Sequence, residues 1–355
     1  MQWEDLIGHE RPREWFRNAI IASRLASTFL FIGPDGIGKR TFARLLGKSL
    51  LCRHGKGEPM APCGVCEDCV QVDASTHPDL LQLGKPADKA TIPIELLIGE
   101  REARMREGLC HELSLRPFSG RRKVAILDDA DSLSIEGGNA LLKTLEEPPP
   151  DSLLILIGTS LQRQLPTIRS RCQTVVFPRL NDSQLCQLLL RLGIADSEEE
   201  AQLLASLSEG SVSEARMLKE HEELREFRNT LLSSLSAPTL PLIQLSKSCS
   251  GLVEAAGKDA RAKRDRLKLL LRMAASFYRG LVIHMTAGHD ASTAVGDPQL
   301  WQLVSQQSDQ WTTGVRGALD CWQRCLTAIE QVDRNVNQAS LLECWVSELA
   351  MASGR

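Results

Sequence analysis

Residues 33–41 read Gly33-Pro34-Asp35-Gly36-Ile37-Gly38-Lys39-Arg40-Thr41, and this stretch decides the fold class. It follows an apolar run at 28–32 and precedes a helical pattern of apolar residues at 42–50. A strand, a glycine-rich turn, a lysine and a helix form a phosphate-binding loop, whose backbone N–H groups bind phosphate oxygens at a helix N-terminus. The sequence therefore predicts a nucleotide-binding loop in which Lys39 reaches the outer phosphates. The predicted contacts in this loop are Gly33, Gly36, Gly38, Lys39, Arg40 and Thr41.

The position after the lysine departs from this motif. A phosphate loop normally carries Ser or Thr there, and the hydroxyl binds Mg²⁺. Here the residue is Arg40, and Thr41 follows one place later. Two interpretations follow. Either the loop is a fold element that no longer supports hydrolysis, or Thr41 takes the role that Arg40 leaves vacant.

A second predicted strand ends in acidic residues. Residues 123–127 are apolar after a basic start, and Asp128-Asp129-Ala130-Asp131 follows them. In phosphate-loop proteins an Asp at such a strand end holds Mg²⁺, and we expect Asp128 in that place. The next residue usually orients the attacking water as a Glu, whereas here it is the shorter Asp129.

Strand and helix patterns alternate up to residue 177. Further strands are predicted at 80–83, 153–158 and 174–177. Thr159 ends the strand at 153–158, where a polar side chain would face the γ-phosphate. The alternation predicts an α/β domain at residues 1–179, with a parallel sheet and helices on both faces.

Four cysteines interrupt this domain at 52–69. Cys63, Cys66 and Cys69 have two residues between neighbours, and Cys52 lies eleven residues upstream of Cys63. Four thiolates at such spacing can hold a tetrahedral Zn²⁺, and they leave no open position for a reactive water. We therefore predict a structural zinc module. An iron–sulfur cluster remains the chemical alternative that spacing does not exclude.

From Pro178 onward the patterns are helical only. Short helices are predicted at 182–192, 197–207 and 211–219, and longer ones within 221–283 and 299–350. Two of the longer helices carry an apolar stripe, and we interpret both stripes as core faces rather than as interfaces. The stripes consist of Leu267, Leu270, Leu271, Ala274 and Tyr278, and of Leu319, Trp322, Leu326, Ile329 and Val332.

Composition limits the classes of function. The 42 basic and 45 acidic residues nearly balance, so the net charge gives no reason to expect nucleic-acid binding. The arginines at 95–115, a predicted helix, are interpreted as a solvated face rather than as a DNA contact. The N-terminus does not resemble a signal peptide, and no apolar run is long enough to cross a bilayer. These features predict a cytoplasmic chain without a membrane partner.

Several of these stretches together resemble a known family. They are Gly33 to Lys39, the four cysteines, Asp128 to Asp131, Asn139 to Pro149, and Ser170-Arg171-Cys172. The combination is similar to the AAA+ subunits of bacterial clamp loaders, over residues 4–180. Within that family it is most similar to the delta-prime subunits of DNA polymerase III, with gamma/tau as the sister group.

The resemblance implies further features of fold and site. It implies an AAA+ core with the zinc module, an all-α lid of three helices at 180–220, and an all-α collar at 221–355 that joins five subunits in a ring. It also implies that Arg171 is an arginine finger, which acts in trans in the ATP site of a neighbouring subunit. In the lid motif that begins at Gly210, Ser213 stands where active relatives carry an Arg that senses the γ-phosphate.

The resemblance also implies a function. We expect a delta-prime-like subunit that supports ATP-driven loading of the sliding clamp onto primed DNA, within a hetero-oligomer that includes gamma/tau-type and delta-type subunits. We expect Zn²⁺ as a structural cofactor, ATP or ADP bound weakly or without hydrolysis, and poor binding of Mg²⁺. The alternatives are a hydrolytically active gamma/tau-type ATPase and a stand-alone AAA+ protein that binds or unwinds DNA.

Overall fold

The computed structural model describes residues 2–54, 59–86, 88–89, 91–119, 121–287, 297–334 and 336–354. The chain divides into two compact units. The first contains Met1–Leu192 and Glu209–Ser213, and the second contains Gly193–Ser208 and Glu214–Arg355. Among the described residues, none of the helices combines the length and the apolar character needed to cross a membrane.

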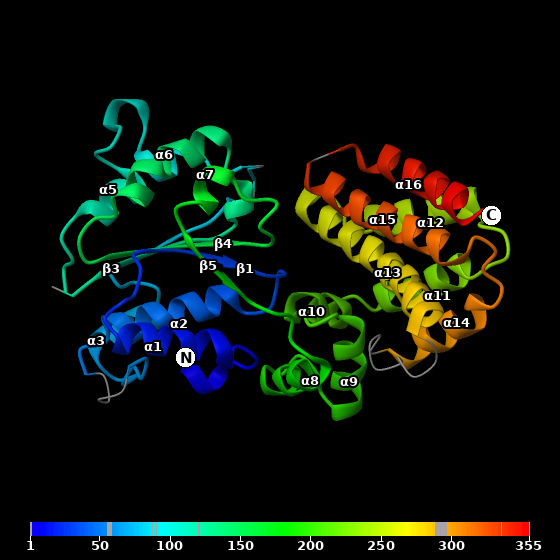
Figure 1. Ribbon diagram of the computed structural model, residues 1–355, viewed down its shortest axis with the longest axis horizontal. Helices are drawn as coiled ribbons and strands as arrows, with labels where there is room; N and C mark the ends of the chain where they lie inside the picture. The colour runs from blue at the N-terminus through cyan, green and yellow to red at the C-terminus, as the bar shows by residue number, and fades with distance from the viewer. Residues whose placement is uncertain are drawn as a thin grey trace. The chain divides into compact units, whose positions relative to one another are not determined.

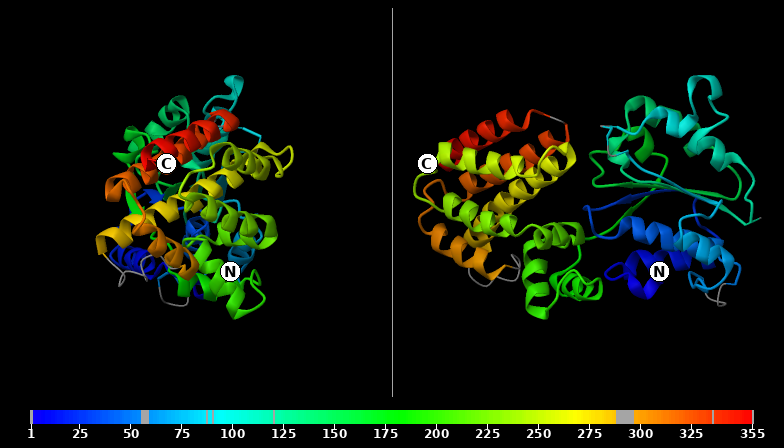
Figure 2. Two further views of the ribbon diagram at one scale, coloured as in Figure 1. Left: turned by 90° about the vertical axis from the view of Figure 1, so that its right-hand side faces the viewer. Right: turned by 180° about the vertical axis from the view of Figure 1, so that it is seen from behind.

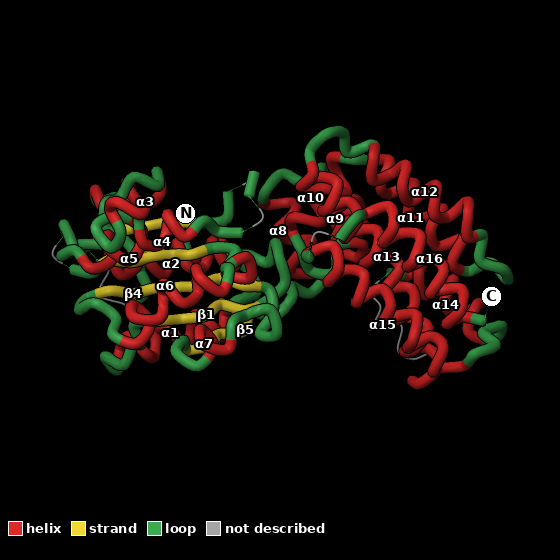
Figure 3. Tube along the Cα trace, turned by 90° about the horizontal axis from the view of Figure 1, so that it is seen from above, coloured by secondary structure: helices red, strands yellow, loops and turns green. Residues whose placement is uncertain are grey.

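The first unit is built on a five-stranded sheet in which the strand pairs are parallel. The strands are β1 (Thr28–Ile32), β2 (Leu80–Leu83), β3 (Lys123–Leu127), β4 (Ser152–Gly158) and β5 (Gln173–Val176). Their order across the sheet is β2-β3-β4-β1-β5, and β4, β1 and β5 run alongside one another in Figure 3. Because β4 lies between β1 and β3, the loops after these strands meet at one edge of the sheet. The predicted parallel sheet is confirmed.

Both faces of the sheet are covered by helices. Figure 1 shows α1 (Glu10–Ile21) and α2 (Lys39–Leu51) on one face, and α5 (Gly108–Ser114), α6 (Ile135–Glu146) and α7 (Pro166–Arg169) on the other. The same two layers are seen from behind in Figure 2. Phe29 and Phe31 pack into one core, whereas Leu30 and Ile32 pack into the other. Burial on both sides explains why the strands are continuously apolar.

An aromatic cluster fixes the helix that follows the phosphate loop. Phe42, on α2, packs edge-on against Phe31 at 5.8 Å and Phe177 at 5.0 Å between ring centroids. Phe16, on α1, lies 5.6 Å from Phe42. All four rings are buried. Such pairs add to the free energy gained from burial alone. The start of α2 is thus held against β1 by packing that does not depend on a nucleotide.

The helix predicted at 95–115 is wrong as a single element. The structure has α4 (Ile94–Ile98), the short 3₁₀ turn η2 (Arg101–Ala103) and α5 in its place. Gly99 and Gly108 break the run, because both have a left-handed backbone with φ of 82° and 85°. A Cβ at Gly108 would lie 2.7 Å from the backbone of Gly99, so the two turns pack without room for a side chain.

The remaining helices follow β5, and three further short elements precede or interrupt the sheet. The helices are α8 (Asp182–Arg191), α9 (Glu198–Leu207), α10 (Val212–Glu220), α11 (Glu222–Leu235), α12 (Leu242–Glu254), α13 (Ala260–Ala287), α14 (Pro298–Ser308), α15 (Gly314–Asp333) and α16 (Gln338–Ser353). The short elements are η1 (Trp3–Asp5), α3 (Glu67–Asp73) and η3 (Ala130–Ser132). The three short helices predicted after residue 180 are α8, α9 and α10. Because the two compact units divide them, a separate lid at 180–220 stays a prediction.

The two apolar stripes of the second unit have different outcomes. On α13 the predicted core residues Leu267, Leu270, Leu271, Ala274 and Tyr278 are all buried, as predicted. On α15 the prediction is largely wrong, because Leu319 and Leu326 are 42% and 38% exposed and only Val332 is buried. The buried face of α15 carries the smaller Ala318, Cys321, Cys325 and Ala328 instead. Small residues there allow close packing on α13, which lies beside α15 in Figure 1.

Candidate functional site

The phosphate loop has the backbone that its glycines predict. Gly36 and Gly38 have φ of 75° and 97°, a left-handed conformation that favours glycine. A Cβ at Gly33 would lie 2.4 Å from the carbonyl oxygen of Phe177. The helix α2 begins at Lys39, directly after the last of these glycines. The structure thus brings the predicted loop residues together at a helix N-terminus.

Lys39 and His9 hold this loop from within. The Lys39 side chain is buried, and its Nζ donates to the carbonyl oxygens of Gly33 and Pro34 at 2.5 Å each. Burial lowers the pKa of Lys39, and the nearby Asp35 and Asp128 partly oppose that shift. His9 Nε2 lies 2.6 Å from the carbonyl oxygen of Ile37, so this nitrogen carries the ring hydrogen and donates a hydrogen bond to that oxygen. The loop is therefore preformed.

Arg40 occupies the side of the loop where a metal ligand is expected. Its Nη1 lies 3.6 Å from Asp128 Oδ2, and its side chain is 61% exposed. Burial and the neighbouring charge of Asp129 raise the pKa of Asp128, while Arg40 and Lys39 lower it. Thr41 is half-buried one residue further along α2, which turns its side chain by about 100° around the helix. A cation thus already lies beside the carboxylate that was predicted to hold Mg²⁺, and the residues present do not fit this ion.

Asp129 lies two residues after the end of β3. Its backbone is left-handed with φ of 56°, and its side chain is exposed. Its Oδ2 lies 3.9 Å from the position of a Cβ built on Gly84, directly after β2. Gly84 follows β2, and β2 lies on the side of β3 away from the phosphate-loop strand β1.

Thr159 lies between the loop and the acidic strand end, because β4 lies between β1 and β3. Its backbone N–H and its hydroxyl both donate to Asp131 Oδ2, at 2.9 and 2.5 Å. The Asp131 carboxylate is buried, which raises its pKa, while Thr159 and Arg163 oppose the shift. A phosphate oxygen would therefore have to displace Asp131 from the only hydroxyl proton of Thr159. The sequence pointed to Asp131 only as part of an acidic run.

Residues 211–213 lie directly on the phosphate loop. The backbone N–H of Val212 donates to the carbonyl oxygen of Gly36 at 3.0 Å. A Cβ at Gly36 would lie 2.5 Å from Ser211 Oγ and 2.7 Å from Ser213 Oγ. The short hydroxyl of Ser213 therefore stands beside the loop at the position where the resemblance expects an arginine.

Arg171 lies at the end of the sheet where β1 begins, opposite the end that carries the phosphate loop. It lies two residues before the start of β5, and its carbonyl oxygen accepts a hydrogen bond of 2.9 Å from Thr28 Oγ1 at the start of β1. The phosphate loop follows the other end of β1, after Ile32. Four strand residues span about 13 Å. Arg171 therefore cannot reach the phosphate loop of its own chain.

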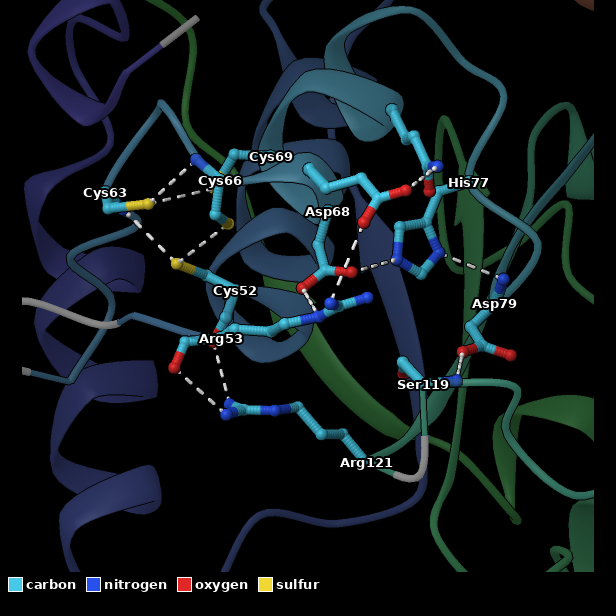
Figure 4. Close-up of polar contacts among 12 residues, drawn as sticks. Cys52, Arg53, Cys63, Cys66, Asp68, Cys69, His77, Asp79, Ser119 and Arg121 are labelled. Carbon is cyan, nitrogen blue, oxygen red and sulfur yellow. Dashed lines mark hydrogen bonds and ion pairs between the residues drawn. The ribbon is translucent and has the colours of Figure 1, made fainter.

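The four cysteines converge on one point, as Figure 4 shows. Their sulfurs all lie within 4.8 Å of one another, with Cys52 and Cys66 3.9 Å apart and Cys63 and Cys69 4.0 Å apart. Tetrahedral Zn²⁺ with Zn–S bonds of about 2.3 Å places sulfurs about 3.8 Å apart. The geometry thus fits a single ion. In a four-iron cluster each thiolate binds a different iron, so the sulfurs would be farther apart.

The local backbone prepares the thiols for a metal. The N–H groups of Val65 and Cys66 lower the pKa of Cys63 to about 6, and the Cys66 N–H lies 3.3 Å from Cys63 Sγ. Gly64 makes this turn with φ of 77°. Burial raises the pKa of Cys52 and of Cys69, so these thiols need a neighbouring cation to ionise at neutral pH.

A buried polar network supports the cysteines from behind. Asp68, next to Cys69, lies 2.8 Å from Arg53 Nε and 3.5 Å from His77 Nε2. His77 Nδ1 accepts the backbone N–H of Asp79 at 3.0 Å, so Nε2 carries the ring proton and faces Asp68. The side chains of Asp68 and His77 are almost fully buried. The negative charge of the buried Asp68 carboxylate is thus compensated by Arg53 on one oxygen and by His77 on the other.

The network continues into the loop before β3. Asp79 is buried and accepts the backbone N–H groups of Phe118 and Ser119 at 2.7 and 2.8 Å. Burial raises the pKa of Asp79, but these hydrogen bonds and His77 outweigh it and hold the pKa below its ordinary value. Arg121 donates to the carbonyl oxygen of Cys52 at 2.7 Å. The cysteine module is thereby attached to the sheet domain. Sequence reasoning missed this network, although Asp68 adjoins a cysteine of the motif.

Comparison with known proteins gives consistent results. The family described as "DNA polymerase III, delta subunit" matches residues 8–181. The DNA polymerase III subunit delta' of Bacillus subtilis is 35% identical over 211 residues, which cover 59% of this chain and 59% of that protein. The delta' subunit of Pseudomonas aeruginosa is 34% identical over 193 residues, which cover 54% and 56%. The tau subunit of Bacillus subtilis is 26% identical over 300 residues, which cover 81% and 51%. The matches thus span little more than half the length of these relatives.

Proposed function

Because the chain belongs to the AAA+ clamp-loader subunits of DNA polymerase III, we propose that it acts as a delta-prime-like subunit. In this role it supports ATP-driven loading of the sliding clamp onto primed DNA. It does so by completing the ATP site of a neighbouring subunit with Arg171, and not by hydrolysing ATP itself. It meets the clamp and the DNA through the complex.

The position of Arg171 is the observation that carries this proposal. Its side chain lies at the end of the sheet opposite the phosphate loop and is 32% exposed, which supports a contact with a phosphate outside its own phosphate loop. A guanidinium delivered in trans stabilises the charge on a transferring phosphoryl group. The chain thus offers this group to a neighbour.

The chain's own nucleotide site lacks three groups that hydrolysis uses. Arg40 replaces the metal-binding hydroxyl, Asp129 is directed toward Gly84, and Ser213 replaces a cationic side chain. Loss of a metal ligand and a charge clamp together removes several kcal/mol of transition-state stabilisation, which slows turnover about a thousandfold or more. We therefore propose that ATP or ADP binds weakly, without Mg²⁺ and without hydrolysis.

The cysteine module is proposed to hold one structural Zn²⁺. The sulfur separations fit one tetrahedral ion, and all four positions are filled by protein. The ion would supply positive charge that keeps Cys52 and Cys69 ionised while buried. Its effect is on folding, because no position is open for a substrate.

The second unit is proposed to join gamma/tau-type and delta-type subunits in a hetero-oligomer. Leu319, Trp322, Leu326 and Ile329 form a partly exposed apolar stripe along α15, with spacings of three and four residues. A stripe of this kind gains free energy when another helix covers it. Its exposure supports a partner helix at this face.

Replacing Arg171 in a reconstituted complex tests the proposal. The complex contains this chain and its gamma/tau-type and delta-type partners. Arg171→Ala should leave assembly intact and slow hydrolysis at the neighbouring site by about a thousandfold. The steady-state ATPase rate of the whole complex should then fall by the fraction that this site contributes to it. Arg169→Ala, which removes an exposed arginine on the adjacent helix α7, is the matched control and should hydrolyse ATP at the normal rate. A full rate with Arg171→Ala would refute the finger assignment.

A further inference from the structure

Within its own chain, the Arg171 guanidinium already has hydrogen-bond partners. Nε donates to Glu146 Oε1 at 2.7 Å, and Nη2 lies 2.5 Å from the same oxygen. Nη1 donates to the carbonyl oxygen of Thr167 at 3.0 Å and to Ser170 Oγ at 3.1 Å. Glu146 ends α6, 25 residues before Arg171, and is directly followed by Glu147 and three prolines.

The number of available N–H groups limits what Arg171 can bind in this arrangement. A guanidinium has five N–H groups, one on Nε and two on each terminal nitrogen. The hydrogen bonds to Glu146, Thr167 and Ser170 use three of them, the one on Nε and both on Nη1, while Nη2 lies against the same Glu146 oxygen. Bidentate binding of a phosphate uses two parallel N–H groups, one on each of two nitrogens. The observed rotamer therefore has to give up a partner before it can clamp a phosphate.

Glu146 is the partner whose release changes the electrostatics. It is the carboxylate among the three acceptors, and it partly neutralises the charge that the finger would present to a phosphate. The pair is half-exposed, with side-chain exposure of 32% for Arg171 and 51% for Glu146. Exposed ion pairs are weak, so a phosphate with more than one negative charge can displace the carboxylate.

We propose that Glu146 is a positioning residue that holds Arg171 in the observed rotamer, bound to its own chain and called here the stowed rotamer. The phosphates of a neighbouring nucleotide would replace Glu146 and release the guanidinium. This inference depends on the proposed role of Arg171 in trans. Only the fraction of subunits with a released Arg171 can stabilise the transition state. Glu146 therefore lowers the kcat/KM for ATP of the assembled complex in proportion to the fraction of subunits in which Arg171 is released.

The test uses the reconstituted complex and Glu146→Ala. The complex with Glu146→Ala should show a kcat/KM for ATP about two- to fivefold above that of the unmodified complex, because a surface ion pair of this kind is worth no more than that factor. Glu147→Ala removes the same charge from the next exposed residue and should leave kcat/KM unchanged. The thermal unfolding midpoint of Glu146→Ala should equal that of the unmodified chain, which separates positioning from a structural role.

A double-mutant cycle separates this inference from the proposed function. In the Arg171→Ala background, Glu146→Ala should have no effect, since there is no guanidinium to release. If Arg171→Ala slows the complex and Glu146→Ala leaves kcat/KM unchanged or lowers it, the stowed rotamer is overturned while the finger stands. If Arg171→Ala itself has no effect, the finger and the inference both fail.

Discussion

The cysteine module and the nucleotide site lie in the same compact unit, but they differ in completeness. In the cysteine module the four sulfurs lie within 4.8 Å of one another, and Asp68, His77 and Asp79 form a buried polar network behind them. In the nucleotide site the glycines and Lys39 are in place, whereas Arg40 stands in the position of a metal ligand. In our proposal, the difference means that this phosphate loop is complete as a fold element and incomplete as a catalyst.

The physical reason lies in what each residue stabilises. Lys39 donates to two carbonyl oxygens of the loop and therefore stabilises the fold without a nucleotide. The residue at position 40 is largely exposed, so its identity affects a bound metal far more than the packing. A substitution there removes chemistry and leaves the fold unchanged.

The largest effect is expected from breaking the cysteine module. Cys69→Ser removes one of the four sulfurs that are proposed to bind Zn²⁺ and should lower the free energy of unfolding of the first unit by more than about 3 kcal/mol. Thermal unfolding followed with and without a chelator measures this. Cys344→Ser, at an exposed cysteine of the other unit, is the control and should unfold like the unmodified chain.

Metal analysis completes this experiment. The purified chain should contain about one Zn²⁺, and Cys69→Ser should contain much less. Iron in place of zinc, or no metal together with unchanged stability, would contradict the structural zinc site.

A smaller effect is expected from the network behind the cysteines. Asp79→Asn should cost about 1–3 kcal/mol, because an amide can accept at one end only and would leave the N–H of Phe118 or Ser119 without an acceptor. Chemical denaturation at pH 7 measures the loss. Asp88→Asn, an exposed carboxylate after β2, is the control and should change stability by less than about 0.5 kcal/mol.

The effect of Asp79 should depend on pH in one direction. Its pKa in the folded chain is held below the ordinary value, so its contribution is present in full above the unfolded pKa of about 4. The contribution is lost as the pH falls through the lower folded pKa. The stability gap between the unmodified chain and Asp79→Asn should therefore be constant from pH 7 to about 5 and close below about 4. A gap that persists in acid would contradict the charged role.

The smallest effect is expected from repairing the nucleotide site. Arg40→Thr restores the hydroxyl and removes the cation beside Asp128, so ATP should bind about tenfold more tightly in Mg²⁺ than in a chelator. The unmodified chain should show no such difference, and neither should Arg40→Ala, which removes the cation without adding a ligand. Calorimetric titration in both buffers measures the ratio. A strong preference for Mg²⁺ in the unmodified chain would remove the distinction between the two regions.

Local patterns in the sequence were enough to predict much of the fold and of the site. The strand at 28–32, the glycine turn and the cysteine spacing each depend on neighbouring residues, and the structure contains all three. Interactions between distant residues were not predictable. Glu146 and Arg171 are 25 residues apart, and Asp79 and Ser119 are 40 apart. The long helix predicted at 95–115 is wrong because Gly99 and Gly108 adopt left-handed backbone conformations that interrupt it, and helical periodicity alone does not indicate this.

The α15 stripe shows another limit of sequence reasoning. Periodicity finds the apolar face of a helix, and here it selected Leu319 and Leu326, which are partly exposed. The face that packs consists of smaller residues such as Ala318 and Cys325. A pattern alone does not tell which of two adjacent faces of a helix is buried by the same chain and which stays exposed.

Turnover of ATP by the isolated, zinc-loaded chain tests most directly whether the phosphate loop is a fold element without chemistry of its own. We predict no hydrolysis above the uncatalysed background, with or without Mg²⁺, and no change with Arg171→Ala. A rate on the order of one per second, an ordinary enzyme rate, would contradict this account and would instead identify an active gamma/tau-type ATPase.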